Sequence, residues 1–584
     1  MAPSRLTSDP RTLFTLQERN RYLLNISVEA GNELYSPDMR LCRQCHDTAV
    51  IFNGYTIGQV SLEYALALLE TGGDAARADA IIDRTLDFQN RDADSPTRGN
   101  FRWMAHFTEV RDGNAVAFMT PNYGMLWLRH GNRLSESTRR RMEEMFPLAA
   151  IGIDKHVVPW QYTNISLLRI WSWMVLGRIT NDNALVQKSS DHWDEWLRGT
   201  SQGGVCEYNS PCYTPVALYT LAGMWEECED SAWKASIERV LEFLYTEFAA
   251  NLHARSACMT GTMSRGYPSD YLYGTGLSAI TAYQQFGVYH SGEWDSNGGR
   301  TPFIANFAVH NYEVPAALRD IPQQATSPYL VRAAIPAAKT LTSNFISDQF
   351  ALGSLSSLEL HPQAIPVIAY QSTNAKRRTL FLKAAPARGA EVLCEQRENE
   401  VIGYLRLAAP AEVTATTAAE VRRATWWLGA WRDIVRIRVD GSPWNGGSSE
   451  FVGSVALWLE VAGLRVDLQV TTEPENRLEL AVCYKELQLQ IDLAVAAESD
   501  QLIRVVRPEM AFLLRVSAAS QSSDAPSLHI EREWGRITRL WTQGENSLSL
   551  KLEGARAAME DEDSGAYDLL HTSPLLQLRR GDLG

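Results

Sequence analysis

The sequence has few cysteines, no long apolar run and no excess of basic residues. Its 584 residues include 8 cysteines, and 55 Lys and Arg stand against 69 Asp and Glu, which gives a net charge of −14. No uninterrupted run of ~18 apolar residues occurs, so we expect no membrane as a partner. The acidic balance argues against nucleic acid as a partner, because binding a phosphate backbone needs a basic surface.

The sequence also lacks the short motifs of nucleotide and zinc-peptidase chemistry. It contains no Walker-type loop, no dinucleotide-binding glycine loop and no H-E-x-x-H. Cys42, Cys45 and His46 have the spacing C-x-x-C-H, but no second C-x-x-C offers further zinc ligands, and haem attachment usually accompanies export. We therefore interpret these cysteines as ordinary thiols and predict no metal and no cofactor.

The composition is that of a globular protein with more than one core. Hydrophobic residues make up 45% of the chain and charged residues 21%, and single cores rarely exceed ~300 residues. The 17 Trp and 21 Tyr can fill cores or form platforms on which flat ligand faces stack. The first residues include no apolar segment of the kind that a secretion signal needs, which predicts a cytoplasmic protein, or a secreted one if a signal has been removed.

Helical patterns occur in pairs over the first 330 residues. Apolar helices are expected at 55–70, 115–130, 162–176, 215–228 and 271–286, and more polar partners at 74–88, 135–145, 183–198 and 232–249. Thr214 is expected to cap one helix, with Pro215 in its first position. A repeat of roughly 50 residues predicts an (α/α) toroid of five or six hairpins over residues 1–330, with an irregular bundle as the alternative.

After residue 330 the apolar residues alternate, as they do in strands. Alternating segments occupy 400–409, 433–440, 451–461, 464–471, 477–484, 486–493, 502–506, 512–516, 527–533 and 547–553, and turn residues separate them. We expect an antiparallel β-sandwich over residues 331–584. The predicted fold class is therefore α+β with two domains.

Polar residues cluster in or just before the predicted apolar helices, where the loops of a toroid would meet. The candidate catalytic residues are His156, Asn164, Glu207, Asn209, Tyr213, Arg265, Tyr267 and Asp270, and the candidate substrate-binding residues are Trp103, Asn122, Tyr123, Trp160 and Tyr208. Each has a structural alternative: an asparagine can cap a helix, a tyrosine can belong to the core, and Arg265 can bridge to Asp270 or Glu207.

This order of a helical toroid and an antiparallel β-sandwich, with Asn, His, Tyr and Arg in the loops, resembles the polysaccharide lyases of the chondroitin AC/hyaluronate and heparinase II/III type. The resemblance implies β-elimination beside a uronate in an oligo- or polysaccharide. In that reaction Asn164 or Asn209 would polarise the carboxylate and Arg265 would bind it. Tyr213 or Tyr267 would be the acid and base, with His156 or His253 as an alternative base. Such lyases are commonly exported, and a net charge of −14 gives no general attraction for a polyanion.

Three other functions remain open. A glycoside hydrolase on the same scaffold would need two carboxylates across the scissile bond, and Glu207 with Asp270 is the natural pair. Asp47 and Asp154 are further carboxylates. The aromatic content also suits a dehydratase, isomerase or cyclase of a small hydrophobic metabolite, and scattered polar residues would favour a non-catalytic carbohydrate-binding protein.

Overall fold

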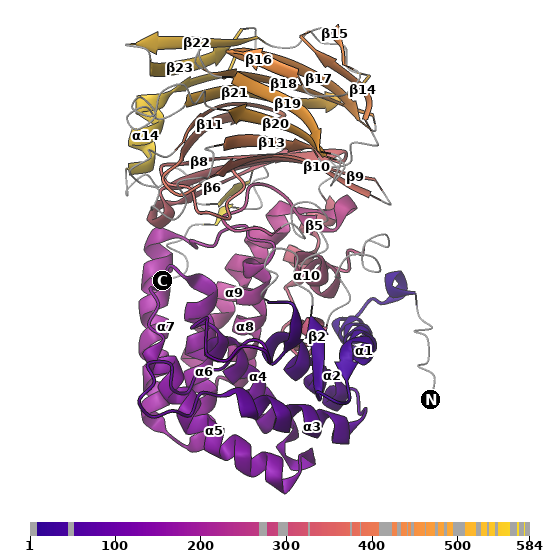
Figure 1. Cartoon of the computed structure of the whole chain (residues 1–584), viewed down its shortest axis with the longest axis vertical. Coiled ribbons are helices and arrows are strands. Elements are labelled where there is room, and N and C mark those ends of the chain that lie inside the picture. Colours follow the sequence, from indigo (N-terminus) through magenta and orange to yellow (C-terminus); the bar gives the residue numbers. More distant parts are fainter. Residues whose placement is uncertain are drawn as a thin grey trace.

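A computed structural model shows a helical part followed by a part made of sheets (Figure 1). It describes residues 9–44, 52–267, 277–289, 302–324, 328–373, 376–385, 387–407, 423–428, 434–440, 442–444, 449–461, 463–472, 477–483, 488–494, 509–520, 527–533, 536–543, 547–560, 569–571 and 577–578. This confirms the predicted fold class of helices first and antiparallel strands second.

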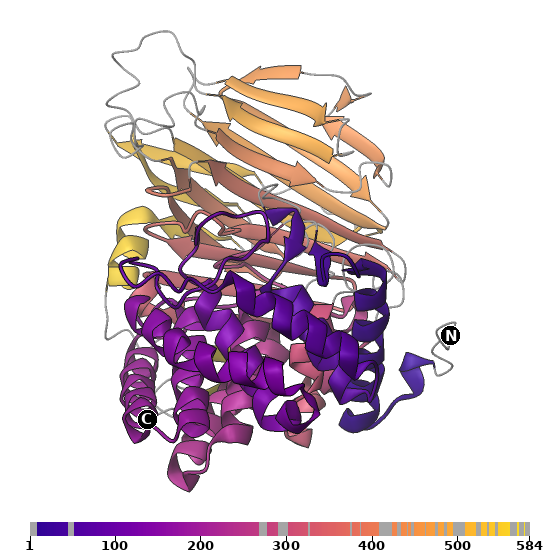
Figure 2. The same cartoon turned by 60° about the horizontal axis from the view of Figure 1, so that its bottom comes forward.

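The helical part is a ring of inner helices with outer partners (Figure 2). The inner helices are α2 (Glu63–Glu70), α4 (Ala115–His130), α6 (Thr163–Thr180), α8 (Tyr213–Glu227) and α10 (Leu277–Phe286). The outer helices, each packed on the inner helix before it, are α3 (Ala75–Thr85), α5 (Glu136–Lys155), α7 (Asn183–Gly203) and α9 (Ser231–Asn251). Helix α1 (Leu16–Leu34) contacts both α2 and α10 and closes the ring.

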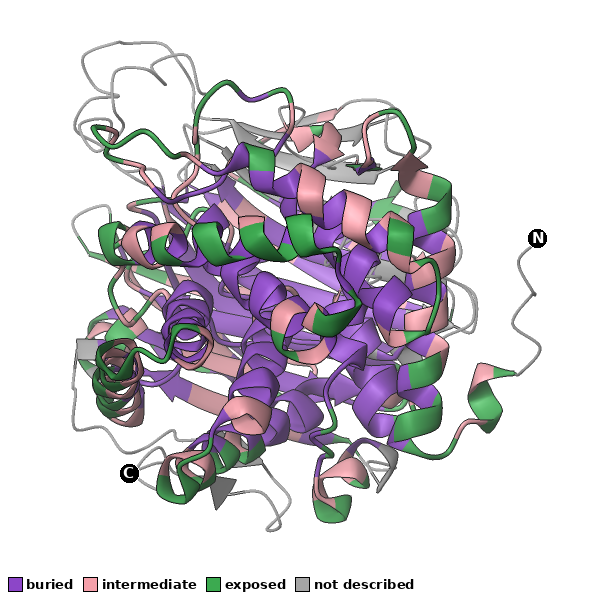
Figure 3. Ribbon diagram, turned by 90° about the horizontal axis from the view of Figure 1, so that it is seen from below, coloured by how far each residue is buried: buried purple, intermediate pink, exposed green. Residues whose placement is uncertain are grey.

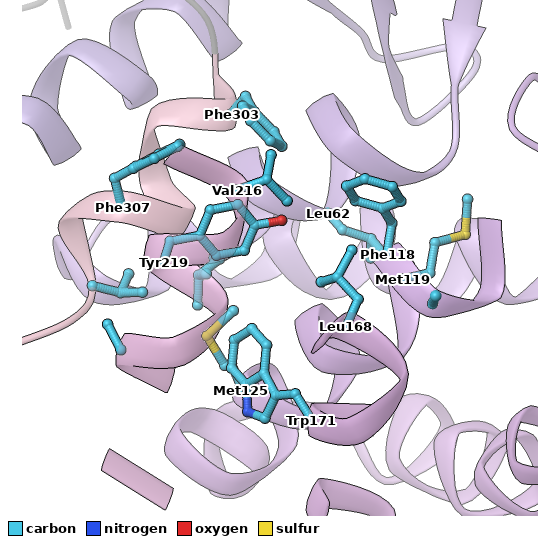
Figure 4. Packing of buried hydrophobic residues seen from close by; sticks show 14 of the residues in the cluster. Leu62, Phe118, Met119, Met125, Leu168, Trp171, Val216, Tyr219, Phe303 and Phe307 are labelled. Atoms are coloured by element: carbon cyan, nitrogen blue, oxygen red, sulfur yellow. The ribbon is translucent and has the colours of Figure 1, made fainter. Parts of the chain in front are cut away.

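The apolar patterns explain which helices lie inside. All residues of α6 from Thr163 to Gly177 are buried, whereas the outer helices keep an exposed polar face (Figure 3). Large side chains fill the centre of the ring, with Phe118, Leu168, Trp171 and Tyr219 pointing inward from three inner helices (Figure 4). The predicted inner and outer sets are therefore confirmed.

Several predicted boundaries are wrong. Residues 54–56 form strand β3 (Gly54–Thr56), and a π-helical turn (Gly58–Leu62) precedes α2. Helix α7 continues to Gly203, and helix α8 begins at Tyr213 with Cys212 in the cap position. Thr214 is thus inside the helix, where its hydroxyl accepts a hydrogen bond from the Ser210 amide. Helix α1 was not predicted, because residues such as Arg19 and Asn20 on its buried face interrupt the apolar stripe.

The strands form layers above the ring. One sheet joins β6 (Tyr329–Ile335), β7 (Thr340–Ile346), β8 (Phe350–Ser357), β9 (Val367–Thr373), β10 (Lys376–Ala385), β13 (Arg423–Leu428), β20 (Gln488–Ala494), β19 (Arg477–Cys483) and β16 (Ser449–Val452). The next joins β11 (Glu391–Arg397), β12 (Glu400–Arg406), β21 (Glu509–Ala518), β18 (Leu464–Thr472), β17 (Ser454–Val461) and β14 (Ile434–Val439). All these pairings are antiparallel, and the two sheets meet where Val392 pairs with Ser357.

The alternation of residues places strand β9 between two cores. Val367 and Ala369 of β9 face the core between the two sheets, whereas Ile368 and Tyr370 pack toward the helical part. A small third sheet of β22 (Leu528–Glu533), β23 (Arg536–Thr542) and β24 (Ser549–Lys551) covers the far side. The predicted strand 547–553 is partly wrong, because α14 (Leu552–Glu560) begins at Leu552, and 502–506 lies outside the described residues.

The first sheet lies against the helical part. Ala250 of α9 and Met263 pack with Val331, Ile346 and Phe381 of that sheet. The change from helix to strand falls between α13 (Ile321–Gln324) and β6. The division into domains at residue 330 remains a prediction.

A buried carboxyl group lies at the centre of the ring. The carboxyl of Glu63 on α2 accepts a hydrogen bond of 2.7 Å from Asn306, and its side chain also contacts Asn122 of α4. Burial raises the pKa of Glu63 well above its usual value, and the two amides offset this shift only in part. Folding therefore favours the neutral form of this carboxyl group.

We predict that Glu63→Gln stabilises the fold at neutral and alkaline pH. A carboxyl whose pKa is raised on folding costs stability once the pH exceeds its unfolded value of ~4.3, and the cost grows up to the folded pKa. The wild-type melting temperature should thus fall relative to that of Glu63→Gln as the pH rises. Thermal unfolding over a pH series measures this, and parallel curves would contradict the prediction.

Candidate active site

Three segments meet between the ring and the first sheet: residues 204–212 before α8, residues 258–267, and the connection 358–366 between β8 and β9. The Tyr208 carbonyl accepts hydrogen bonds from the amide and hydroxyl of Ser264, and the Ser210 hydroxyl donates to the Arg265 carbonyl. The Gly266 amide donates to the Gln363 carbonyl. These bonds fix the three backbones side by side.

Arg265 joins all three segments through its side chain. Its guanidinium donates to Glu207 Oε1 at 2.5 Å, to the Tyr213 hydroxyl at 3.1 Å and to Gln363 Oε1 at 2.8 Å. The same group lies 4.0 Å from the ring centroid of Tyr213 and 5.4 Å from that of Tyr162. A guanidinium carries five N–H groups, so two remain after these three bonds to described residues.

Glu207 is a buried partner of Arg265. Both of its oxygens accept hydrogen bonds from the Asn164 side chain, at 2.8 and 2.7 Å, and Oε2 also accepts from the Asn164 amide at 2.7 Å. Because that amide lies in the first turn of α6, the carboxylate also benefits from the positive end of the helix dipole. Asn164 is fully buried, so its position suits holding Glu207 rather than touching a ligand.

Tyr213 and Tyr267 form a pair of phenols beside this ion pair. Their hydroxyl oxygens are 2.6 Å apart. Burial raises the pKa of Tyr213 far above its usual value, although Arg265 acts in the opposite direction, and burial also raises the pKa of Tyr267. Both phenols are therefore neutral near pH 7, and a proton can pass between them along a short hydrogen bond.

A polar chain extends from this cluster toward α4. Arg265 lies over the ring of Tyr162, and the hydroxyl of Tyr162 accepts a hydrogen bond of 3.0 Å from the side-chain amide of Asn114. Asn114 Oδ1 in turn lies 2.9 Å from His156 Nε2. Burial and Arg169 lower the pKa of His156, so its imidazole is neutral at pH 7. The predicted base His156 is thus linked to Arg265 through two intervening side chains.

The starts of three inner helices converge on this region. Asn114 precedes α4, Tyr162 precedes α6 and Tyr213 opens α8, and all three take part in the network just described. Helix N-termini carry partial positive charge, so their convergence favours an anionic group.

Other predicted site residues have internal partners. Asn209 donates to the Thr260 and Thr262 carbonyls at 2.7 Å each. His253 is buried with Nε2 2.9 Å from the Ser347 carbonyl. Asn122 and Tyr123 are buried in α4, where the Tyr123 hydroxyl donates to Thr85.

The remaining candidates lie apart from this network or outside the described residues. Tyr208 is buried in the core between the two large sheets. Trp103 is bonded through its indole N–H to Asp112, and Trp160 packs closely over Gly199 of α7. Asp270, Asp47, Cys45 and His46 lie outside the described residues, and Asp154 bonds Trp173 and Lys188 on the outer side of the ring.

Two residues of the connection between β8 and β9, His361 and Gln363, were not predicted from the sequence. Gln363 bonds Arg265 and also contacts the Tyr267 side chain. His361 has its pKa lowered to about 4 by partial burial of its ring and by the positive charge of Arg265. No local pattern identifies them, because they are about 100 residues distant from Arg265 in the chain. Tyr162, at the start of the predicted helix 162–176, was not among the predicted site residues either.

Within the part of the chain that the structure describes, no cluster of His, Cys, Asp or Glu side chains is suited to hold a metal ion. Among the same residues, no helix has the length and apolarity to cross a membrane.

The chain is similar to one family model and to several solved structures. A family model for a domain of unknown function (DUF8769) matches residues 21–297. The chain is similar to a chondroitinase AC lyase solved with oligosaccharides (8% identity, 91% of this chain and 87% of that one, TM-score 0.42). It is also similar to the Streptomyces coelicolor A3 chondroitin AC lyase with chondroitin sulphate (9% identity, 92% of this chain and 84% of that one, TM-score 0.42). A further similar structure is heparinase III, the BT4657 gene product (9% identity, 94% of this chain and 93% of that one, TM-score 0.34). No curated protein matches significantly by sequence.

We predict that Gly353→Ala displaces the segment that carries Arg265. A Cβ at Gly353 of β8 would lie 2.6 Å from Gly261 Cα and 2.7 Å from the Thr262 amide nitrogen. These are backbone atoms, so they can move away only if the segment itself is displaced. The expected cost is ~1–3 kcal/mol of unfolding free energy. Urea denaturation measures it, with Gly554→Ala as the control, because a Cβ at Gly554 meets no atom within 4 Å. Equal midpoints for the two variants would refute the prediction.

Proposed function

We propose that this protein is a carbohydrate-active lyase that cleaves uronate-containing oligo- or polysaccharides by β-elimination. The observation that carries the proposal is the Tyr213 hydroxyl, which lies between the Arg265 guanidinium at 3.1 Å and the Tyr267 hydroxyl at 2.6 Å. A cation beside two short-bonded phenols provides charge stabilisation and proton transfer at one place.

The reaction needs both functions. Removing the proton from the carbon next to a uronate carboxylate builds negative charge on that carboxylate, and Arg265, with the helix N-termini around it, would stabilise this charge. The electrons then form the carbon–carbon double bond as the bond to the glycosidic oxygen breaks. That oxygen takes a proton, and Tyr213, neutral because burial raises its pKa, would supply it, with Tyr267 returning a proton to Tyr213.

The group that removes the carbon-bound proton would be an imidazole. His361 lies within electrostatic range of Arg265, and its pKa of about 4 keeps it unprotonated near neutral pH. His156 is the second candidate, although two side chains separate it from Arg265. If His361 is the base, the connection between strands β8 and β9, in the second part of the chain, contributes a residue to the catalytic step.

Glu207 fits a positioning role better than that of a hydrolase acid. Its two oxygens receive three bonds from Asn164 and a further bond from Arg265, so its acceptor positions are occupied. A hydrolase needs two carboxylates that reach the scissile bond. This geometry favours the lyase over the hydrolase alternative.

We predict that Tyr213→Phe lowers the turnover of a uronate polysaccharide by ~10²–10⁴-fold, because the variant loses the proton donor and keeps the ring. Tyr267→Phe should cause a smaller loss. The assay follows the ultraviolet absorbance of the unsaturated product over a panel of uronate polysaccharides.

Tyr123→Phe is the control, because it removes a buried phenol hydroxyl away from the site that bonds only Thr85 among the described partners. Cleavage that gives saturated ends, or full activity in Tyr213→Phe, would exclude this lyase mechanism. Loss of activity in Glu207→Gln alone, with saturated products, would support the hydrolase.

A further inference from the structure

Glu247 is a buried carboxyl group behind the candidate site. It lies in the last turn of the outer helix α9 and is 8% exposed. Its Oε1 accepts a hydrogen bond of 3.2 Å from the Asn209 amide, two residues after Glu207. A carboxylate at the C-terminal end of a helix faces the negative end of the helix dipole, so this place disfavours its charged form.

Asn209 connects Glu247 to the candidate site. Its φ of 44° is left-handed, a conformation that asparagine tolerates and most residues do not. Its side chain donates to the carbonyls of Thr260 and Thr262, which lie just before Arg265. Asn209 therefore ties the segment that carries Glu207 and leads into Tyr213 to the segment that carries Arg265.

We propose that Glu247 is a positioning residue whose protonation state controls how firmly residues 204–212 are held against residues 258–267. The inference rests on the proposed function for its catalytic meaning, because the residues so held are Glu207, Tyr213 and Arg265. The structural part of the proposal requires no substrate.

Among the described residues, no side chain gives Glu247 a compensating charge. Burial raises its pKa to about 7, the Asn209 amide opposes this rise, and no charged side chain of the described part contributes. Helices α8, α12 (Ala316–Arg319) and α13 pack against α9, but their charged residues Glu226, Glu227 and Arg319 pair elsewhere. In the site itself, Glu207 and Arg265 neutralise each other.

The direction of the effect follows from linkage. In the closed arrangement Glu247 has a pKa of about 7, whereas a hydrated carboxyl has ~4.3. The closed arrangement thus binds a proton more strongly than an opened one, and raising the pH favours opening. Between about pH 6 and about pH 8 the population of the opened form should rise up to about tenfold.

Hydrogen exchange with mass spectrometry tests this on the full chain without substrate. Peptides that cover residues 204–212 are followed at about pH 6 and about pH 8, with rates corrected for intrinsic exchange. The wild type should open up to about tenfold more at the higher pH. Glu247→Gln keeps an oxygen acceptor for the Asn209 amide and cannot titrate, so its opening should not change with pH.

Glu242→Gln is the control, because Glu242 is an exposed residue of the same helix and its variant should retain the wild-type response. If Glu247→Gln does not fold, measurements on the wild type and on Asn209→Gly still test the proposal. Glycine keeps the left-handed backbone and the backbone amide but lacks the side-chain bonds to Thr260 and Thr262. In Asn209→Gly, residues 204–212 should therefore open more than in the wild type at both pH values, with the wild-type ratio of opening between the two pH values. A wild-type opening that does not depend on pH, or a dependence that persists in Glu247→Gln, would overturn the proposal.

The outcome is separable from the proposed function. The pH response of residues 204–212 can be present in a protein that never cleaves a uronate polysaccharide, and activity can depend on Tyr213 in a protein whose segment does not respond to pH. If both hold, activity on such a polysaccharide should fall above about pH 7 in the wild type and remain level in Glu247→Gln.

Discussion

The buried ion pair between Arg265 and Glu207 is the interaction on which the site depends. Its groups are 2.5 Å apart, and the side chains are 14% and 6% exposed. Removing one partner of such a pair leaves an uncompensated charge and costs ~3–5 kcal/mol. Further hydrogen bonds support the pair: Asn164 donates to Glu207, and Gln363 and Tyr213 accept from Arg265.

This pair also explains why both parts of the chain are needed. Asn164 belongs to the ring, Arg265 to the segment after α9, and Gln363 to the connection between strands β8 and β9. The first sheet lies closely against the ring at Gly353 and Gly261, where neither position has room for a side chain. The position of Arg265 is thus set by packing between the two parts as much as by its own segment.

The sequence predicted the features that depend on local periodicity. The apolar helices and alternating strands could be identified because each segment carries its own pattern, and Glu207, Tyr213, Arg265 and Tyr267 were recognised because they share the loops before inner helices. Gln363 and His361 could not be identified, because only the tertiary fold brings them to Arg265. The role of Asn209 was also hidden, since its partners are backbone carbonyls about 50 residues away.

The central claim is that a substrate carboxylate binds at Arg265 beside Tyr213. A crystal structure of Tyr213→Phe with a bound uronate oligosaccharide tests it most directly, because the variant should bind substrate without turning it over. The account predicts a uronate carboxylate within hydrogen-bond distance of Arg265 and the glycosidic oxygen next to the position of the missing hydroxyl. A saccharide bound on the outer sheets, or one that meets the ring without approaching Arg265, would contradict it.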